Sequence, residues 1–340
     1  MTIETTYFLG AGASKAIYPT LPLASEMTLE YLLGGSPKGF DQAIENVEQY
    51  MIDQHWPEEK RFIPFEQIYL EFPKNLEPLC PRENLEICLF RKLRIEGKLC
   101  AGGPDSWLGR SLSSGHPILT TNYDTVIEWD VENLMSTPVG YGDSGIIDYG
   151  VPDHVCLSLP LAGPRLDGKR NKLLLLKLYG SMSWSQCEHC GKFLLEKIYE
   201  RGAEDAIIGR GKCPACEGTR RNAVFVPLVG QKSPNDIALH AIWKEAARAL
   251  SESREIVFAG FSLNPDDKSI GDLLRRAFSA GHTSKVTVVL DKNRPEITDR
   301  YTEIYGDVVQ FCESGWVRYL SEGKQEGAPA LLKTQKNDRS

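Results

Sequence analysis

Short runs of apolar residues recur along the chain and alternate with longer stretches whose apolar residues fall at helical spacing. The apolar runs that predict buried strands cover residues 5–9, 117–121, 173–178, 255–259 and 285–290. Between the last two runs, residues 266–280 are amphipathic and predict a helix. Strands that alternate with helices are typical of βαβ units. The pattern therefore predicts an α/β fold with a doubly wound, Rossmann-like parallel sheet.

Two stretches interrupt this alternation and predict insertions into one large domain, residues 1–325. From about residue 21 to about residue 110, apolar residues keep mostly helical spacing, which predicts a helical insertion. Residues 184–222 carry paired cysteines and predict a small zinc-ribbon module. We expect residues 326–340 to form a polar tail.

Composition and charge narrow the class of protein. Hydrophobic residues make up 41% and charged residues 25% of the 340 positions, as in an ordinary globular protein. The longest apolar runs fall far short of the roughly 20 residues that a membrane span needs, so we expect no membrane partner. The start of the chain has no secretory signal pattern, and we expect a cytoplasmic protein. A net charge of −7 argues against broad binding to nucleic acid.

The cysteines predict a metal site, because nine cysteines in a reducing compartment favour metal ligation over disulfides. Four of them form two CxxC pairs, Cys187 with Cys190 and Cys213 with Cys216, and 22 residues lie between the pairs. This spacing can bring four thiolates around one zinc ion, in a closed shell that would make the metal structural. A pair of redox CxxC sites, unliganded core cysteines and ligation by His189 are the alternatives.

A turn of small residues follows the first predicted strand. Gly10 and Gly12 would let the backbone approach a pyrophosphate, and the helix that follows would offer its free N–H groups. Lys15 stands where the dehydrogenase fingerprint has its third glycine, and no strand ends in an acidic residue about 20 residues later. This disfavours a hydride-transferring dehydrogenase. A turn whose glycines serve only packing is the alternative.

Polar residues follow three further predicted strands. Asn122 and Asp124 follow the second strand, Tyr179 ends the third, and Gly260 with Ser262 follows the fourth. The carboxyl ends of parallel strands share one edge of the sheet, where such folds bind their ligands. For each of these residues, a helix cap is an equally good interpretation.

Taken together, these segments resemble the sirtuin family. The resemblance is carried by Gly-Ala-Gly-Ala-Ser at residues 10–14, Thr-Thr-Asn-Tyr-Asp at 120–124, Lys-Leu-Tyr-Gly-Ser at 177–181, the two CxxC pairs and Gly-Phe-Ser-Leu at 260–263. It covers roughly residues 5–315 and looks closest to the bacterial sirtuin-like proteins associated with NAD hydrolysis in phage defence. The resemblance implies NAD as the cofactor and NAD or ADP-ribose as the ligand. It leaves open a homo-oligomer or a defence-system partner protein.

The resemblance also implies roles for individual residues. The implied cofactor-binding residues are Gly10, Ala11, Gly12 and Ser14 at the pyrophosphate, Gly260 and Ser262 at the adenosine half, Asp291 at the adenine ribose, and Thr121, for which the resemblance implies no particular part of the cofactor. The implied catalytic residues are Asn122, Asp124 and Tyr179. An asparagine can hydrogen-bond a carboxamide or a water, and a nearby carboxylate can favour a developing oxocarbenium charge.

The chain departs from the family pattern in two places. Sirtuins place a histidine, the general base, where this chain has Tyr179, and a tyrosine hydroxyl is protonated at neutral pH. Acyl-lysine deacylases carry Phe-Gly-Glu after the zinc module, where this chain reads Phe-Val-Pro at residues 225–227. We therefore expect a protein of the NAD glycohydrolase type, cleaving NAD to nicotinamide and ADP-ribose with weakened or conditional activity. The alternatives are a non-catalytic NAD or ADP-ribose sensor and an NAD-dependent protein-lysine deacylase.

Overall fold

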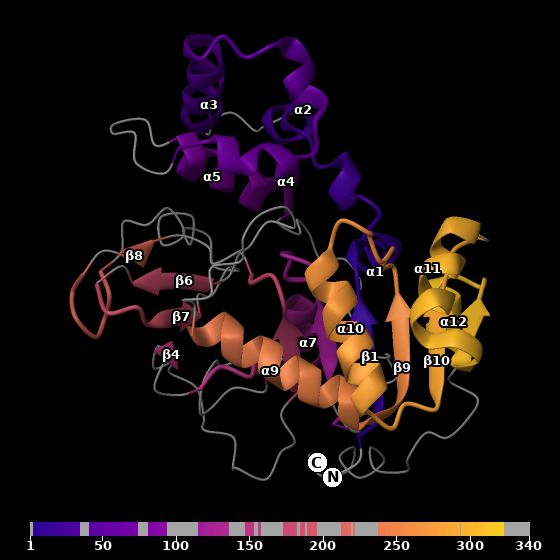
Figure 1. The fold of residues 1–340 in the computed structure, drawn as a ribbon. Coiled ribbons are helices and arrows are strands. Elements are labelled where there is room, and N and C mark those ends of the chain that lie inside the picture. Colours follow the sequence, from indigo (N-terminus) through magenta and orange to yellow (C-terminus); the bar gives the residue numbers. More distant parts are fainter. Residues whose placement is uncertain are drawn as a thin grey trace, which may run out of the picture.

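The structure is a computed structural model. It describes residues 3–34, 41–73, 81–93, 115–135, 147–152, 156–157, 173–181, 184–187, 189–195, 212–218, 220–221, 237–292 and 294–322. The ribbon shows a layered α/β body, a cluster of helices that extends from one end of it, and a small second sheet at its side (Figure 1).

Seven parallel strands form the main sheet, in the order β11-β10-β9-β1-β2-β5-β3. The strands are β1 (Ile3–Leu9), β2 (Ile118–Thr120), β3 (Ile147–Asp148), β5 (Leu173–Lys177), β9 (Ser253–Ala259), β10 (Lys285–Val289) and β11 (Val309–Cys312). All five predicted strands are present, which confirms the predicted parallel sheet. The apolar pattern does not predict β3, which is two residues long, or β11, in which no residue is buried.

The chain winds outward from β1 in both directions. After β1 it builds β2 and later β5 on one side, and it then returns to place β9, β10 and β11 on the other side. The winding direction therefore switches at β1, whose neighbours are β2 and β9. In doubly wound sheets, ligands bind outside the carboxyl ends of the strands beside such a switch point. The topology directs attention to the ends of β2, β1 and β9.

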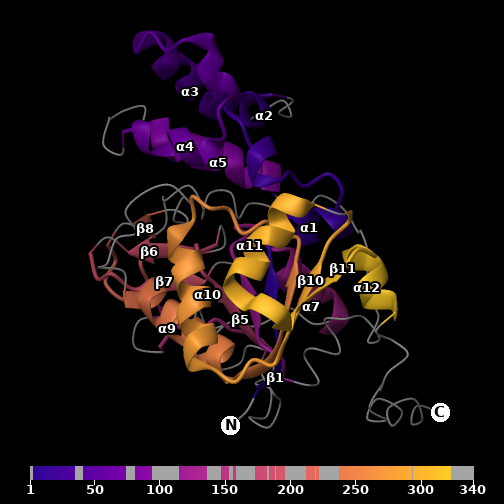
Figure 2. The ribbon, with the colours of Figure 1, turned by 45° about the vertical axis from the view of Figure 1, so that its right-hand side comes forward.

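Helices cover both faces of the main sheet. They are α1 (Ala11–Ile17), α7 (Val126–Met135), α9 (Ile237–Glu252), α10 (Lys268–Ala280), α11 (Pro295–Tyr305) and α12 (Trp316–Glu322). Figure 2 shows α10 and α11 in front of the strands and α7 behind them. Helix α10 buries Ile270, Leu273 and Leu274. Leu273 and Leu274 follow Ile270 by three and four residues, so the three side chains lie on one face of the helix. The predicted amphipathic helix is therefore confirmed.

The predicted helical insertion follows α1. Its α-helices are α2 (Leu29–Leu33), α3 (Asp41–Asp53), α4 (Phe65–Ile68) and α5 (Pro81–Leu93), with 3-10 turns at Ala24–Glu26, Glu58–Phe62 and Tyr69–Glu71. Leu32, Val47 and Leu85 are fully buried where α2, α3 and α5 pack together. Both ribbon views place these helices beyond the carboxyl ends of the strands (Figures 1 and 2). The insertion therefore lies on the side of the sheet where a ligand would bind.

The small sheet has the strand order β4-β7-β6-β8. Its strands are β4 (Cys156–Leu157), β6 (Trp184–Cys187), β7 (Phe193–Leu195) and β8 (Arg220–Arg221). The Trp184 ring packs edge-on against Tyr149, which follows β3, at 5.2 Å between ring centroids. This contact anchors the small sheet to the main body. Among the described helices, none is long and apolar enough to cross a membrane, and the predicted polar tail lies outside the described residues.

Candidate functional site

Three glycines press the turn after β1 against the turn after β9, and we call this contact the glycine seam (Gly10, Gly12 and Gly260). Gly12 N donates a hydrogen bond to Gly260 O at 3.0 Å, and Gly10 N donates to Ala259 O at 2.9 Å. A Cβ atom at Gly10 would lie 2.4 Å from Gly260 O, and one at Gly12 would lie 2.8 Å from Gly260 Cα. Packing thus accounts for these glycines without a ligand. It also places two predicted binding turns side by side.

Asn122 joins the end of β2 to the turn after β1. Its Nδ2 donates to Ser14 Oγ at 2.9 Å, and its backbone N donates to Thr120 Oγ1 at 3.0 Å. The Thr120 hydroxyl in turn donates to Leu9 O at 2.8 Å. Asn122 and Ser14 are both buried. The structure therefore brings together two residues that are 108 positions apart. The family resemblance implies that Ser14 binds the pyrophosphate of NAD and that Asn122 acts at the nicotinamide end of the same ligand.

Asp124 forms a local turn at the start of the helix that follows it. Its Oδ1 accepts a hydrogen bond at 3.1 Å from the backbone N of Val126, the first residue of α7, which forms an Asx turn at the entry to the helix. The backbone O of Asp124 accepts from Lys177 Nζ. Lys177 also forms a fully buried ion pair with Glu128, with 3.0 Å between Nζ and Oε1. Burial raises the pKa of Glu128, although the charge of Lys177 opposes this. The ion pair holds the segment that contains Asn122 and Asp124.

Tyr179 is fully buried at the carboxyl end of β5, where its hydroxyl donates to Asp267 Oδ2. Asp267 is the N-cap of α10, and its Oδ1 accepts from Ile270 N at 3.3 Å. Burial, and after it the charge of Asp267, raises the pKa of Tyr179. The hydroxyl therefore stays protonated and is a hydrogen-bond donor, not a base. Asp267 could be predicted as a helix cap, but nothing in the sequence indicates its bond to Tyr179.

A second buried carboxylate, Glu66, reaches the same edge from the helical insertion. Glu66 lies in α4, is 7% exposed, and accepts a hydrogen bond from Tyr123 Oη at 3.1 Å. Burial raises the pKa of Glu66 to about 7, the bond from Tyr123 opposes the rise, and the charge of Asp267 adds to it. Sequence reasoning misses Glu66, because a glutamate in a short helix has the pattern of a solvent-facing residue.

The other predicted cofactor residues lie nearer the surface of this edge. Ser262 is exposed, and its backbone O accepts from Arg300 Nη1 at 3.0 Å. Asp291 follows β10, is exposed, and has its Oδ2 3.5 Å from Arg294 Nη2. Ala11 and Thr121 are half-buried. Hydrogen bonds therefore unite the predicted nicotinamide and pyrophosphate residues, whereas Ser262 and Asp291 have other partners.

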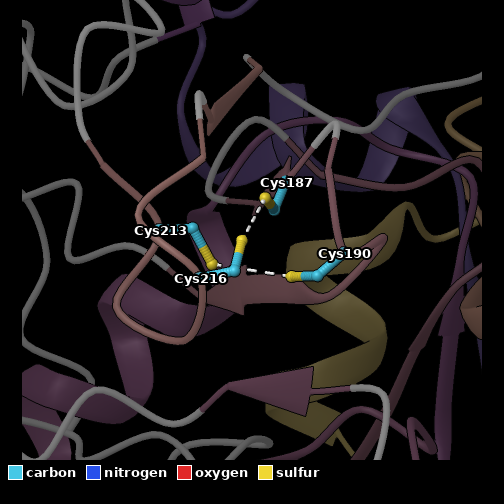
Figure 3. A group of neighbouring side chains, drawn as sticks. All are labelled: Cys187, Cys190, Cys213 and Cys216. Carbon is cyan, nitrogen blue, oxygen red and sulfur yellow. Dashed lines mark hydrogen bonds between the residues drawn. The ribbon is translucent and has the colours of Figure 1, made fainter.

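Four cysteines gather beside the small sheet (Figure 3). The Sγ atoms of Cys187, Cys190, Cys213 and Cys216 all lie within 4.8 Å of one another. The Cys187 and Cys216 sulfurs are 3.4 Å apart, and the Cys190 and Cys213 sulfurs are 3.7 Å apart. Zinc–sulfur bonds of about 2.3 Å in a tetrahedron require sulfurs separated by about 3.8 Å. The cluster therefore fits a zinc ion.

The backbone around the cluster closes a tight turn at each CxxC pair and favours the ionised form of Cys187. Gly191 N donates to Cys187 O at 2.9 Å, and Glu217 N donates to Cys213 O at 2.8 Å, which closes a tight turn around each CxxC pair. Burial opposes ionisation of Cys187, but backbone N–H groups of the turn and neighbouring thiols lower the pKa of Cys187 to about 6. The thiolate is the form that binds zinc. His189 is exposed and, among the described residues, is not part of the group.

The chain shows only low sequence identity to the known proteins that it resembles. No family model and no curated protein matches the sequence. Among solved structures, one described as "The Structural basis of Sirtuin Substrate Affinity" is 14% identical, with a TM-score of 0.43, and the match covers 96% of this chain and 95% of that chain. "Structural Basis for the Mechanism and Regulation of Sir2 Enzymes" has 14% identity and a TM-score of 0.41, covering 95% and 94%. A complex of Sir2, a p53 peptide and NAD+ has 14% identity and a TM-score of 0.40, with the same coverage.

Proposed function

We propose that this protein is a sirtuin-like NAD-binding protein of the NAD glycohydrolase type, which cleaves NAD to nicotinamide and ADP-ribose. One observation carries the proposal: the hydrogen bond between Asn122 and Ser14 joins two motif segments at the topological switch point of the sheet. The glycine seam holds a third motif segment, residues 260–263, against the first. A single dinucleotide at this edge would meet all three segments.

Each segment offers groups suited to one part of NAD. The backbone at residues 10–14 would receive the pyrophosphate, and the exposed side chains of Ser262 and Asp291 can accept hydrogen bonds from ribose hydroxyls. Asn122, with Thr121 beside it, would hold the carboxamide or orient a water. The half-buried carboxylate of Asp124 would favour positive charge as the nicotinamide leaves.

A non-catalytic sensor of NAD or ADP-ribose is the second candidate. It is favoured by the hydrogen bond between Tyr179 and Asp267, because Tyr179 occupies the position of the family's histidine but is held as a protonated donor. For a protein-lysine deacylase, the informative segment is residues 225–227, which lies outside the described residues. No contact in the described part of the chain favours that activity.

We also propose that the four cysteines bind one structural zinc ion. Four thiolate ligands would complete the coordination shell of a zinc ion and leave no position for water or substrate, so the metal would stabilise the small sheet and take no part in NAD cleavage.

Nicotinamide release tests the proposed function. We expect purified protein to release nicotinamide from NAD, and we expect Asn122→Ala to lower the rate by roughly 10²–10³-fold, the usual effect of losing one preorganised polar group at the reacting centre. Asn46→Ala, in helix α3 of the insertion, is the matched control and should keep the wild-type rate.

Calorimetric titration separates the two candidate functions. Binding of NAD and ADP-ribose without nicotinamide release would favour the sensor. Equal release by wild type and Asn122→Ala would remove Asn122 from the mechanism. Absence of both binding and release would contradict the proposal as a whole.

A further inference from the structure

The helical insertion brings a carboxylate to the strand ends where NAD is proposed to bind. Glu66 lies in α4, and its hydrogen-bond partner Tyr123 directly follows Asn122 in the chain. The two side chains are 7% and 4% exposed. The insertion therefore makes a buried polar contact with the segment that carries the proposed nicotinamide-binding residue.

Glu66 interacts with three titratable side chains from three other segments. Tyr123 at the end of β2 donates the hydrogen bond, and the negative charge of Asp267 at the start of α10 acts on Glu66. Both carboxylates also act electrostatically on Tyr179 at the end of β5. Glu66 is therefore close to the position where sirtuins carry their histidine.

The two carboxylates of this group are not equivalent. Asp267 uses one oxygen to cap α10 and the other to accept the Tyr179 hydroxyl. Glu66 accepts a hydrogen bond from Tyr123 on Oε1, and no described lysine or arginine neutralises it. A buried carboxylate without a cationic partner keeps a high affinity for protons. Glu66 is thus the carboxylate of the group that is suited to accept a proton.

Building on the proposed NAD hydrolysis, we propose that Glu66 is its general base and supplies the function that Tyr179 cannot. In this step the bond between ribose C1′ and the nicotinamide nitrogen breaks, and its electron pair leaves with nicotinamide. The oxygen of a water molecule forms a bond to C1′, and one proton of that water moves to Glu66. Glu66 then releases the proton to solvent, so the reaction consumes only NAD and water.

The acidity of Glu66 agrees with this role. Burial raises its pKa to about 7. A general base is most effective when its pKa lies near the working pH, because it is then largely ionised and still strongly basic.

The variant Glu66→Gln tests the inference, because it keeps the shape of the side chain and removes the base. We expect kcat for nicotinamide release to fall by roughly 10²–10⁴-fold, the usual contribution of a general base, with little change in KM or in the Kd for NAD. For the wild type, we expect kcat to rise with pH through about 7, and we expect this rise to disappear in Glu66→Gln. Glu66→Asp should restore part of the rate.

Glu86→Gln is the matched control. Glu86 lies in α5 of the same insertion and also accepts a hydrogen bond from a tyrosine, Tyr69. It should keep the wild-type rate. If Glu66→Gln hydrolyses NAD as fast as the wild type, the inference is overturned and the proposed function stands. If the wild type releases no nicotinamide, the proposed function fails and the role of Glu66 fails with it.

A second variant tests the same inference if Glu66→Gln does not fold. The Tyr123 hydroxyl lowers the pKa of Glu66, so Tyr123→Phe should move the midpoint of the kcat–pH profile to higher pH. An unchanged midpoint in a folded Tyr123→Phe protein would overturn the assignment of Glu66 as the titrating base.

Discussion

Polar side chains at the carboxyl edge of the sheet are paired with one another across distant segments. The pairs are Asn122 with Ser14, Tyr179 with Asp267 and Tyr123 with Glu66. Because each side chain is buried, removal of one partner costs the other a hydrogen bond that water cannot easily replace. Activity changes in single variants therefore combine chemistry with local rearrangement, and double variants are needed to separate the two effects.

The raised pKa of Glu66 predicts a pH-dependent contribution to stability. Its pKa is about 7 in the folded protein against 4.5 for the unperturbed group. The contribution is therefore fully present below pH 4.5 and is lost as the pH rises through about 7. The shift corresponds to about 3 kcal/mol. Between pH 4.5 and pH 8, we therefore expect the free energy of unfolding of the wild type to fall by about this amount relative to that of Glu66→Gln.

Urea denaturation across this pH range measures the difference. A constant difference between wild type and Glu66→Gln at all pH values would show that Glu66 has an ordinary pKa in the folded protein. It would also weaken its assignment as a base.

The sequence predicts some of these residues and not others, for a physical reason. Asn122 and Tyr179 stand directly after apolar runs that read as strands, and strand ends of parallel sheets share one edge. Glu66 and Asp267 act through tyrosines that are 57 and 88 residues away. No local spacing encodes such contacts, so only the folded structure reveals them.

At the scale of elements, the small sheet is short, and its loops converge on the four cysteines. We predict that the wild type holds one zinc ion per chain and that Cys213→Ser, or treatment with a strong chelator, removes it and lowers the melting temperature. Bound metal contributes directly to folding free energy in such modules, so its loss should unfold the small sheet first. Elemental analysis and thermal melting check both effects.

Cys312→Ser is the control for this experiment, because Cys312 lies in β11 and not in the cluster. It should retain zinc. Full zinc content in Cys213→Ser would contradict the four-thiolate site.

Helices and strands could be predicted where a single hydrophobic periodicity extends over a whole segment. The five predicted strands have mostly buried residues, and α10 has one clearly apolar face. Within the insertion, the spacing indicates helices but does not fix their bounds, because 3-10 turns at Glu58–Phe62 and Tyr69–Glu71 interrupt it. Edge strands such as β11 escape prediction, because partial exposure removes their apolar signal.

At the scale of the whole molecule, the glycine seam fastens the two halves of the sheet together. Gly260 has a φ of +61°, and a Cβ atom there would lie 1.9 Å from Ala13 N. We therefore expect Gly260→Ala to lower the free energy of unfolding by more than about 3 kcal/mol, since backbone strain of this kind costs of order 1–3 kcal/mol before the clash is added. NAD binding should weaken in parallel.

Gly306→Ala isolates the effect of the clash. Gly306 also has a positive φ, +56°, but a Cβ atom at this position would meet no described atom within 4 Å. The Gly306→Ala variant should therefore be destabilised only by the strained backbone conformation. Equal destabilisation of the two variants, measured by urea denaturation, would show that close packing at the seam is not required.

The seam also constrains the order in which this protein can assemble. Gly10 and Gly260 are 250 positions apart in the sequence. The turn after β1 is therefore synthesised early, but it can form the glycine seam only after the last third of the chain has been synthesised. A nascent chain that stops before β9 would contain the turn after β1, which we propose to bind phosphate, but would lack the opposing turn that packs against it. We therefore expect the proposed NAD site to form late, when the second half of the sheet closes against the first.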